Sequence, residues 1–302
     1  MFRNSQTIVQ WLRLIRLPNQ FSVPGDVIGG LALAGGLMLE KPDYLKLGLA
    51  VIIAFLLYNA GLLLNDWFDR DIDAKERPDR PIPSGAVSAR QVMTVAILTI
   101  VLANVIAFFI GPLSLFVTIA LSLCVIAYNA FAKNVFLLGF LVMSSCRSLS
   151  LLLGASIIGL ENQRVIVAAV IIFLYIMAVC WIAVNEVDKL PPKIAIISAF
   201  LISILTLLPG LGVQDVELNF QCIGVYLAAL LMLLNSLMIC IALWRNTIIP
   251  KTGKYVGALI KNLILIQAFW VAIGTHNNCL WAVAMLLLWP LAQFASRKFY
   301  GS

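Results

Sequence analysis

The chain has 302 residues, of which 62% are apolar and 12% are charged, and its formal net charge is +7. Soluble globular chains carry about 25% charged residues, so this composition excludes a water-soluble enzyme, a nucleic-acid-binding protein and a disordered scaffold. In a membrane protein, an excess of lysine and arginine is typical of the cytoplasmic loops.

Apolar segments of about 20 residues, the length that a helix needs to cross the hydrocarbon layer of a bilayer, recur along the whole chain. Prolines and glycines separate several of them. The ten predicted spans are residues 19–39, 45–64, 90–110, 113–131, 135–158, 165–184, 194–211, 221–244, 255–274 and 279–296. We therefore predict an all-α protein, a polytopic membrane helical bundle that forms a single membrane domain over residues 1–302.

The positions of the basic residues predict the orientation of the bundle. If the N-terminus is cytoplasmic and the spans alternate in direction, sixteen of the 21 lysines and arginines lie on the cytoplasmic side and three on the outer side. Because cytoplasmic loops carry the excess of positive charge, both termini are predicted to face the cytoplasm. The predicted location is an integral, multi-pass membrane protein, in the cell inner membrane if the source is bacterial.

An acidic segment follows directly on the second predicted span. If the helix continues at about 100° per residue, four oxygen-bearing side chains share one narrow face while Asp71 points away. These four residues are Asn65, Asp66, Asp69 and Asp73. Like charges on one face repel, and Mg²⁺ relieves that repulsion because it takes oxygen ligands and bridges carboxylates to substrate phosphates. The segment predicts a magnesium site; a solvated acidic helix end is the alternative.

Two arginines lie in the proline-rich loop that follows, residues 77–85. Arg77 and Arg80 are close in sequence to the acidic face. A guanidinium group binds phosphate through two parallel hydrogen bonds, so both residues are predicted to bind phosphate. The alternative is a membrane-edge anchor that attracts anionic lipid.

The acidic segment and the arginine loop together resemble the first signature of the UbiA superfamily of intramembrane prenyltransferases. The resemblance covers about residues 10–275. It implies a core of about nine helices (residues 19–274), preceded by a cytoplasmic amphipathic segment (residues 1–18) and followed by an added tenth span and tail (residues 275–302). The active site of this superfamily opens to the cytoplasmic side, which agrees with the distribution of charge.

The same resemblance implies an enzyme that transfers a prenyl group from a polyprenyl diphosphate to an aromatic or other small acceptor, with Mg²⁺ as cofactor. The implied catalytic residues are Asp66, Asp69, Asp73 and Lys133. The implied diphosphate-binding residues are Arg16, Arg77, Arg80, Tyr128 and Lys133. Metal and cations stabilise the charge that develops on the leaving diphosphate. The apolar helices exclude water from the reactive cation.

The chain departs from the superfamily where a second aspartate-rich motif is expected, at residues 185–193. Glu186 and Asp188 remain as ligands of a second metal, but prolines and a lysine replace the later acid. This motif predicts weak binding of a second ion or none. Lys189 or Lys193 is predicted to contact the phosphates instead, unless both are only positive-inside anchors. The defect also motivates an alternative function, a lipid or metabolite transport or binding protein that has lost prenyl transfer.

Two charged residues fall inside predicted spans, Asp26 in the first and Arg147 in the fifth. Charges are costly in lipid, so both are expected to face the bundle interior. An ion pair that fixes helix packing and a role in the substrate pocket, together with Asn185, are both open. The residues around the two charges resemble the EboC-like branch of UbiA-related proteins.

The expected partners are a polyprenyl diphosphate, an acceptor that the sequence does not identify, and membrane lipid. No nucleic acid and no obligate protein partner is expected. A CDP-alcohol phosphotransferase fits less well, because its Asp-Gly…Ala-Arg…Gly pattern is missing around residues 69–73.

Overall fold

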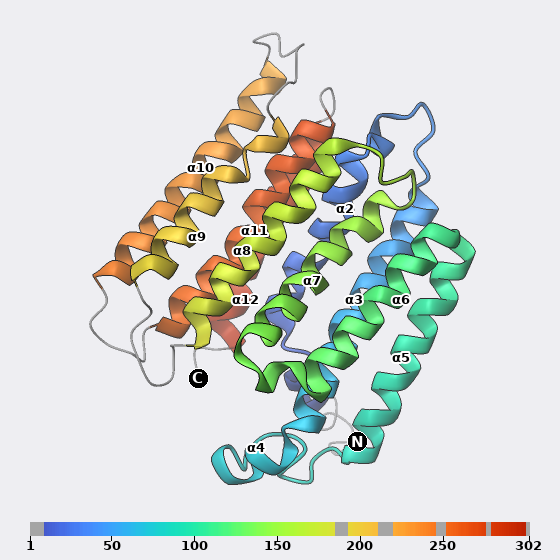
Figure 1. The fold of residues 1–302 in the computed structure, drawn as a ribbon, viewed down its shortest axis with the longest axis vertical. Helices are drawn as coiled ribbons and strands as arrows, with labels where there is room; N and C mark the ends of the chain where they lie inside the picture. The colour runs from blue at the N-terminus through green and yellow to red at the C-terminus, as the bar shows by residue number, and fades with distance from the viewer. Residues whose placement is uncertain (1–8, 185–192, 211–219, 246–251, 276–278, 300–302) are drawn as a thin grey trace.

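A computed structural model describes residues 9–184, 193–210, 220–245, 252–275 and 279–299, and these form helices and turns without a strand. The α-helices are α2 (Val23–Leu33), α3 (Tyr44–Phe68), α4 (Arg70–Glu76), α5 (Ala89–Ile110), α6 (Pro112–Ala130), α7 (Phe136–Ala155), α8 (Gln163–Val184), α9 (Lys193–Leu205), α10 (Phe220–Trp244), α11 (Thr252–Gly274) and α12 (Cys279–Phe299). The 3-10 helices are η1 (Leu17–Ser22), η2 (Gly36–Met38), η3 (Ala132–Asn134) and η4 (Leu208–Gly210). The long helices lie side by side in one bundle (Figure 1). The predicted all-α fold is confirmed.

Seven helices of the described chain are long and apolar enough to cross a membrane: α3, α5, α6, α7, α8, α11 and the unit of α9 with η4. Shorter apolar stretches, Ala229–Trp244 and Leu280–Phe294, lie within α10 and α12. Large apolar side chains cover the outside of the bundle, as Phe108, Phe109 and Phe116 on α5 and α6 illustrate. A membrane supplies the apolar surroundings that such a surface needs, and the chain is an integral, multi-pass membrane protein.

The first predicted span differs most from its expected form. In place of one helix over residues 19–39, α2 has 11 residues and is flanked by η1 and η2. The helix ends because Gly35 adopts a left-handed conformation, with φ of 87°, which a residue without a Cβ adopts readily. Nine residues of α2 are buried, so this short helix lies inside the bundle rather than against lipid.

Glycines bring α2 into direct contact with two of its neighbours. A Cβ on Gly30 would lie 1.9 Å from the carbonyl oxygen of Leu151, and one on Gly154 would lie 1.9 Å from that of Val27. A Cβ on Gly274 of α11 would approach the backbone of Ala32 to 2.4 Å. Small residues allow helix backbones to approach closely in membrane proteins. Helices α2, α7 and α11 therefore form a tightly packed centre.

One end of the bundle collects the polar motifs. At the lower end of Figure 1, α3 leads into α4, which projects below the other helices, and the chain then turns up into α5. Helix α6 ends at the same level, and η3 connects it to α7. The predicted tenth span, α12, packs against α11 and η1.

Candidate functional site

The acidic residues lie where α3 gives way to α4. Helix α3 ends at Phe68 and α4 begins at Arg70, but the hydrogen bonds from the Asp69 amide to the Asn65 carbonyl (3.0 Å) and from the Asp73 amide to the Asp69 carbonyl (2.8 Å) continue the helical ladder. Asp66 and Asp73 are therefore buried on the same side. The side chain of Asp71 is 84% exposed and contacts only its neighbour Arg70, at 3.7 Å, among the described residues.

Three basic residues from three separate segments meet these carboxylates. Arg80, in the loop after α4, places Nη1 2.6 Å from Oδ2 of Asp73 and 3.5 Å from Oδ1 of Asp66. Arg16 Nη2 lies 3.2 Å from the same oxygen of Asp66. Lys133 of η3 places Nζ 2.5 Å from Oδ1 of Asp69. Three negative charges thus face three positive charges. The acid–base cluster, as we name it, consists of Asp66, Asp69, Asp73, Arg16, Arg80 and Lys133.

The backbone at Arg16 is bent to bring its side chain into this cluster. Arg16 has φ of 45°, and it is the only residue other than glycine with a positive φ in the described part of the chain. This left-handed conformation costs roughly 1–2 kcal/mol for a residue with a Cβ. The bend turns the chain into η1, and the ion pair with Asp66 is one contact that holds it.

A cavity of about 410 Å³ opens beside the cluster. The end of the cavity next to the cluster, which we name the mouth, is polar and is lined by Arg16, Asn65, Tyr128 and Asn129. Apolar side chains of α3, α6, α8 and α11 form most of its wall. Nothing in the sequence marks Asn129 except that it follows Tyr128; its amide donates to the carbonyl oxygens of Gly61 and Val125 and so joins α6 to α3.

The remaining predicted diphosphate ligand, Arg77, lies apart from the cluster. It is exposed, and the described residues offer it no ion pair. The sequence predicts the same role for Arg77 and Arg80, but in the fold only Arg80 contacts the carboxylates of the cluster.

The oxygen donors fit a magnesium ion by their chemistry. Three carboxylates and the amide of Asn65 follow one another on one side of a nearly continuous helix, and Mg²⁺ prefers such ligands. Within the described residues, however, no three metal-binding side chains converge on one point. Each carboxylate of the acid–base cluster instead contacts a cation.

The second predicted metal site cannot be compared with the structure, because Asn185, Glu186, Asp188 and Lys189 lie outside the described residues. Lys193, at the start of α9, places Nζ 4.6 Å from the ring centre of Trp244 at the end of α10. This is the geometry of a cation–π contact. Figure 1 shows these helix ends at the side of the bundle, away from α4. The described contact of Lys193 therefore favours the alternative that it is a positive-inside anchor rather than a ligand of the phosphates.

The two charges inside the spans contact each other. Nε of Arg147 lies 3.1 Å from Oδ2 of Asp26, whose side chain is fully buried. Gln267 of α11 donates to Oδ1 of Asp26 at 2.6 Å and to the Ser22 carbonyl at 2.9 Å. The expected ion pair is therefore present, and Arg147 also lines the cavity. Gln267 is the only polar side chain in the apolar stretch of residues 263–274, a signal from which its burial could be inferred.

Comparison with known proteins decides the family. The UbiA prenyltransferase family matches residues 27–244, most of the chain. The chain belongs to the UbiA prenyltransferase family. It is 34% identical over 146 residues to the digeranylgeranylglyceryl phosphate synthase of Methanosarcina mazei, covering 48% of this chain and 49% of that protein. The corresponding enzyme of Methanothermobacter thermautotrophicus is 35% identical over 130 residues, 43% of this chain and 46% of that protein. The chain thus spans about half the length of these curated relatives.

Solved structures of UbiA proteins share the fold. A structure described as giving structural and mechanistic insights into digeranylgeranylglyceryl phosphate synthase superposes with a TM-score of 0.64 at 20% identity, over 89% of this chain and 99% of that chain. A UbiA homologue from Archaeoglobus fulgidus bound to GPP and Mg²⁺ superposes with a TM-score of 0.62 at 17% identity, over 88% and 98% of the two chains. At such identities the likeness concerns the fold alone.

Proposed function

We propose that the protein transfers a prenyl group from a polyprenyl diphosphate to an acceptor within the membrane, with Mg²⁺ as cofactor. The observation that carries this proposal is the acid–base cluster at the mouth of an apolar cavity. A polyprenyl diphosphate has the matching shape, because a highly charged head adjoins a long apolar chain.

In this proposal Asn65, Asp66, Asp69 and Asp73 hold the magnesium ion. The ion supplies positive charge to the diphosphate as it leaves. Oδ1 of Asp66 and Oδ2 of Asp73 contact Arg80, so a metal that used these two oxygens would have to displace Arg80.

Arg16, Arg80 and Lys133 are the proposed ligands of the diphosphate oxygens, with Tyr128 beside them at the cavity mouth. When these cations bind phosphate, they release the carboxylates, so binding of diphosphate favours binding of metal at the acids. Arg77 is exposed, and we propose that it adds only long-range attraction between the mouth and an anionic substrate. Glu186 and Asp188 are proposed to add a weak second metal site.

The apolar wall of the cavity takes the prenyl chain and keeps water away from the allylic carbon. Exclusion of water matters because an allylic cation reacts with any water that reaches it. We further propose that this mouth faces the cytoplasm. It lies at the end where Arg70, Lys75, Arg77, Arg80 and Lys133 gather, and cytoplasmic ends carry the excess of positive charge.

The second candidate function is binding or transport of a prenyl diphosphate without transfer. It is favoured by the loss of acidic residues from the second motif, residues 185–193. Both functions need the acid–base cluster, and only transfer breaks the C–O bond.

A single experiment separates the two functions. The full chain in lipid nanodiscs is incubated with Mg²⁺, radiolabelled geranyl diphosphate and a lipid extract of the source organism. Transfer predicts release of inorganic diphosphate and a labelled lipid product, and both should disappear in Asp66→Asn. Tight binding of geranyl diphosphate without diphosphate release would support the transport or binding function instead. No binding in any condition contradicts both.

A further inference from the structure

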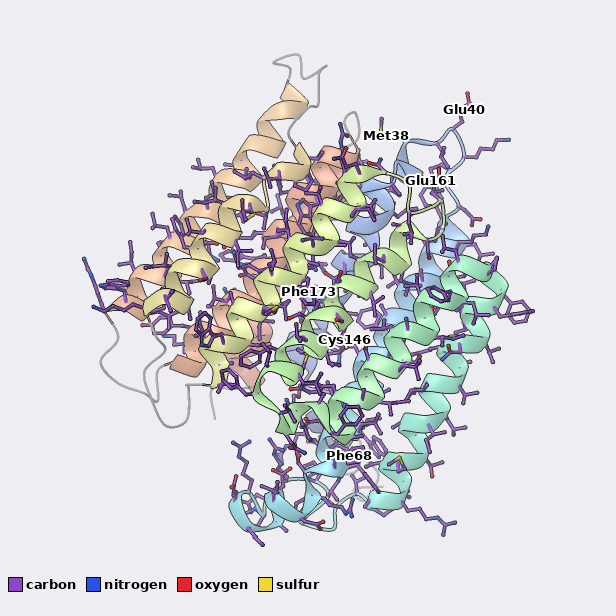
Figure 2. The ribbon with its side chains drawn as sticks, in the orientation of Figure 1. Met38, Glu40, Phe68, Cys146, Glu161 and Phe173 are labelled. Atoms are coloured by element: carbon purple, nitrogen blue, oxygen red, sulfur yellow. The ribbon has the colours of Figure 1, made fainter. Side chains whose placement is uncertain are left out.

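The cavity has a second polar zone, far from its mouth. Arg147, Ser22 and Ser150 line it there, and we name this zone the floor. Arg147 lies eleven residues after the start of α7, which corresponds to about 16 Å along the helix axis. Figure 2 shows its neighbour Cys146 near the middle of the bundle, well above Phe68 at the end of α3. A diphosphate held by the acid–base cluster does not reach the floor, so Arg147 is not one of its ligands.

The guanidinium group of Arg147 is fixed on one side. Nε faces Asp26, and Nη2 donates to the Ser22 carbonyl at 3.3 Å. Asp26 and Gln267 behind it are fully buried, whereas 13% of the Arg147 side chain remains exposed. An arginine has five N–H donors in a rigid fork. The contacts with Ser22 of η1 and Asp26 of α2 therefore hold the fork in place. Among the described residues Nη1 has no hydrogen-bond partner, and Arg147 lines the cavity.

Helix packing alone does not account for this ion pair. The approach of α2 to α7 is already set by Gly30 and Gly154, whose missing Cβ atoms would collide with backbone oxygens. The approach of Gln267 depends on Gly25, because a Cβ there would lie 2.0 Å from the Gln267 Oε1 atom. Buried ion pairs contribute little net stability compared with apolar residues of the same volume. A charged residue that lines a cavity within the membrane more often serves a ligand.

We propose that Arg147 is a positioning residue for the prenyl acceptor, and that the floor binds an uncharged carbonyl oxygen of that molecule. This inference rests on the proposed function. The charge of Arg147 is neutralised by Asp26 at 3.1 Å, so a carboxylate or phosphate would add an unpaired negative charge inside the membrane, next to Asp26. Such a charge is costly, whereas a neutral oxygen accepts a hydrogen bond from Nη1 without that cost.

The probe for the test is 4-hydroxybenzophenone, a neutral phenol whose ketone oxygen accepts hydrogen bonds and whose excited state attaches to nearby C–H groups. The full chain in nanodiscs is irradiated with the probe, and the attachment sites are mapped by mass spectrometry. We expect attachment at Val23, Met143 and Cys146, which line the cavity beside Arg147. Attachment confined to the mouth, or no attachment, overturns the proposal.

The matched variant is the double substitution Asp26→Leu with Arg147→Met, which removes both charges and leaves neither unpaired. Attachment at the floor should fall about tenfold, as expected for loss of one hydrogen bond to a charged donor. Binding of geranyl diphosphate with Mg²⁺ should not change. Unchanged attachment at the floor in this variant would show that Arg147 does not position the probe.

A competition series tests the chemical class in the wild-type chain and does not depend on how the variant folds. 4-Hydroxyacetophenone should displace the probe at about one tenth of the concentration needed for 4-ethylphenol, which has the same shape without the ketone oxygen. 4-Hydroxybenzoate should compete no better than 4-ethylphenol. If the carboxylate competes best, the floor is an anion site and the proposal is wrong. Failure of geranyl diphosphate to bind at the mouth would overturn the proposed function and leave this competition result standing.

Discussion

The mouth and the floor of the cavity both neutralise buried charge, but they do so in different ways. At the mouth, Arg16 and Arg80 keep 33% and 25% of their side-chain surface exposed; Arg16 contacts Asp66, and Arg80 contacts both Asp66 and Asp73. At the floor, Asp26 and Gln267 are closed off from solvent and are held by glycine-lined backbone contacts. Partners that water reaches exchange at modest cost, whereas a closed pair stays fixed. The mouth is therefore suited to binding and release, and the floor to positioning.

The largest effect is expected from the acids of the mouth. Asp66→Asn or Asp69→Asn should lower Mg²⁺-dependent affinity for geranyl diphosphate by about a hundredfold, because one charged ligand of the ion is lost. Asp71→Asn is the matched control, since its side chain faces solvent, and it should change affinity less than about twofold. Isothermal titration in nanodiscs measures both. Equal losses at Asp69 and Asp71 would refute the one-sided arrangement of the acids.

Around the floor, we expect a substitution that disturbs helix packing to destabilise the protein. Gly154→Ala places a methyl group against the carbonyl oxygen of Val27, and we expect a loss of about 1–3 kcal/mol in the free energy of unfolding. Gly257→Ala on α11 is the control, because no atom lies within 4 Å of its added Cβ. That variant should be neutral or more stable by about 0.5–1 kcal/mol. Thermal unfolding in detergent compares the stability of the two variants. If Gly154→Ala is the more stable one, the close approach of α2 and α7 is contradicted.

Within the arginine loop, the two arginines should differ. Arg80→Gln should weaken binding of geranyl diphosphate by about tenfold, since one charge-assisted hydrogen bond is lost. Arg77→Gln should weaken it less than about threefold, and that loss should vanish at high salt because it reflects long-range attraction. Affinities measured at two ionic strengths separate the residues. Equal, salt-independent losses would place Arg77 in the site.

The smallest effect is expected at Lys193, which lies over Trp244 and away from α4. Lys193→Ala and Lys193→Asp should both leave the affinity for geranyl diphosphate within about twofold of the wild type. The titration is made at fixed Mg²⁺. A clear loss of affinity in both variants would show that Lys193, at the start of α9, contributes to diphosphate binding at the mouth, which would contradict this prediction.

Sequence patterns predicted the membrane helices well, because a helix in lipid must satisfy its own backbone hydrogen bonds and needs a continuous apolar stretch. The same reasoning fails at α2. Apolarity predicts burial, but it does not distinguish burial in lipid from burial in protein, and α2 lies among α3, α7 and α11. Its early end at Gly35 depends on backbone conformation, which the apolar pattern does not report.

Some features of the candidate site also follow from the sequence, and others follow only from the tertiary structure. The spacing of Asp66, Asp69 and Asp73 is a local property of a helix, and the sequence alone determined that these acids share one side. The choice of Arg80 over Arg77, and the meeting of Arg16 with an acid 50 residues away, depend on how loops fold back onto the end of α3. No local pattern contains that information.

By itself, the sequence determined a helical membrane protein with an acidic face beside an arginine loop, because helix period and apolar length are short-range properties. Only the tertiary structure decided what surrounds these charges. It joined Arg16, Arg80 and Lys133 to three acids, and it placed Arg147 on the floor of a cavity with Gln267 behind its partner. Contacts between distant segments follow from the packing of helices against one another, and that packing depends on the glycines and side-chain volumes of several helices at once.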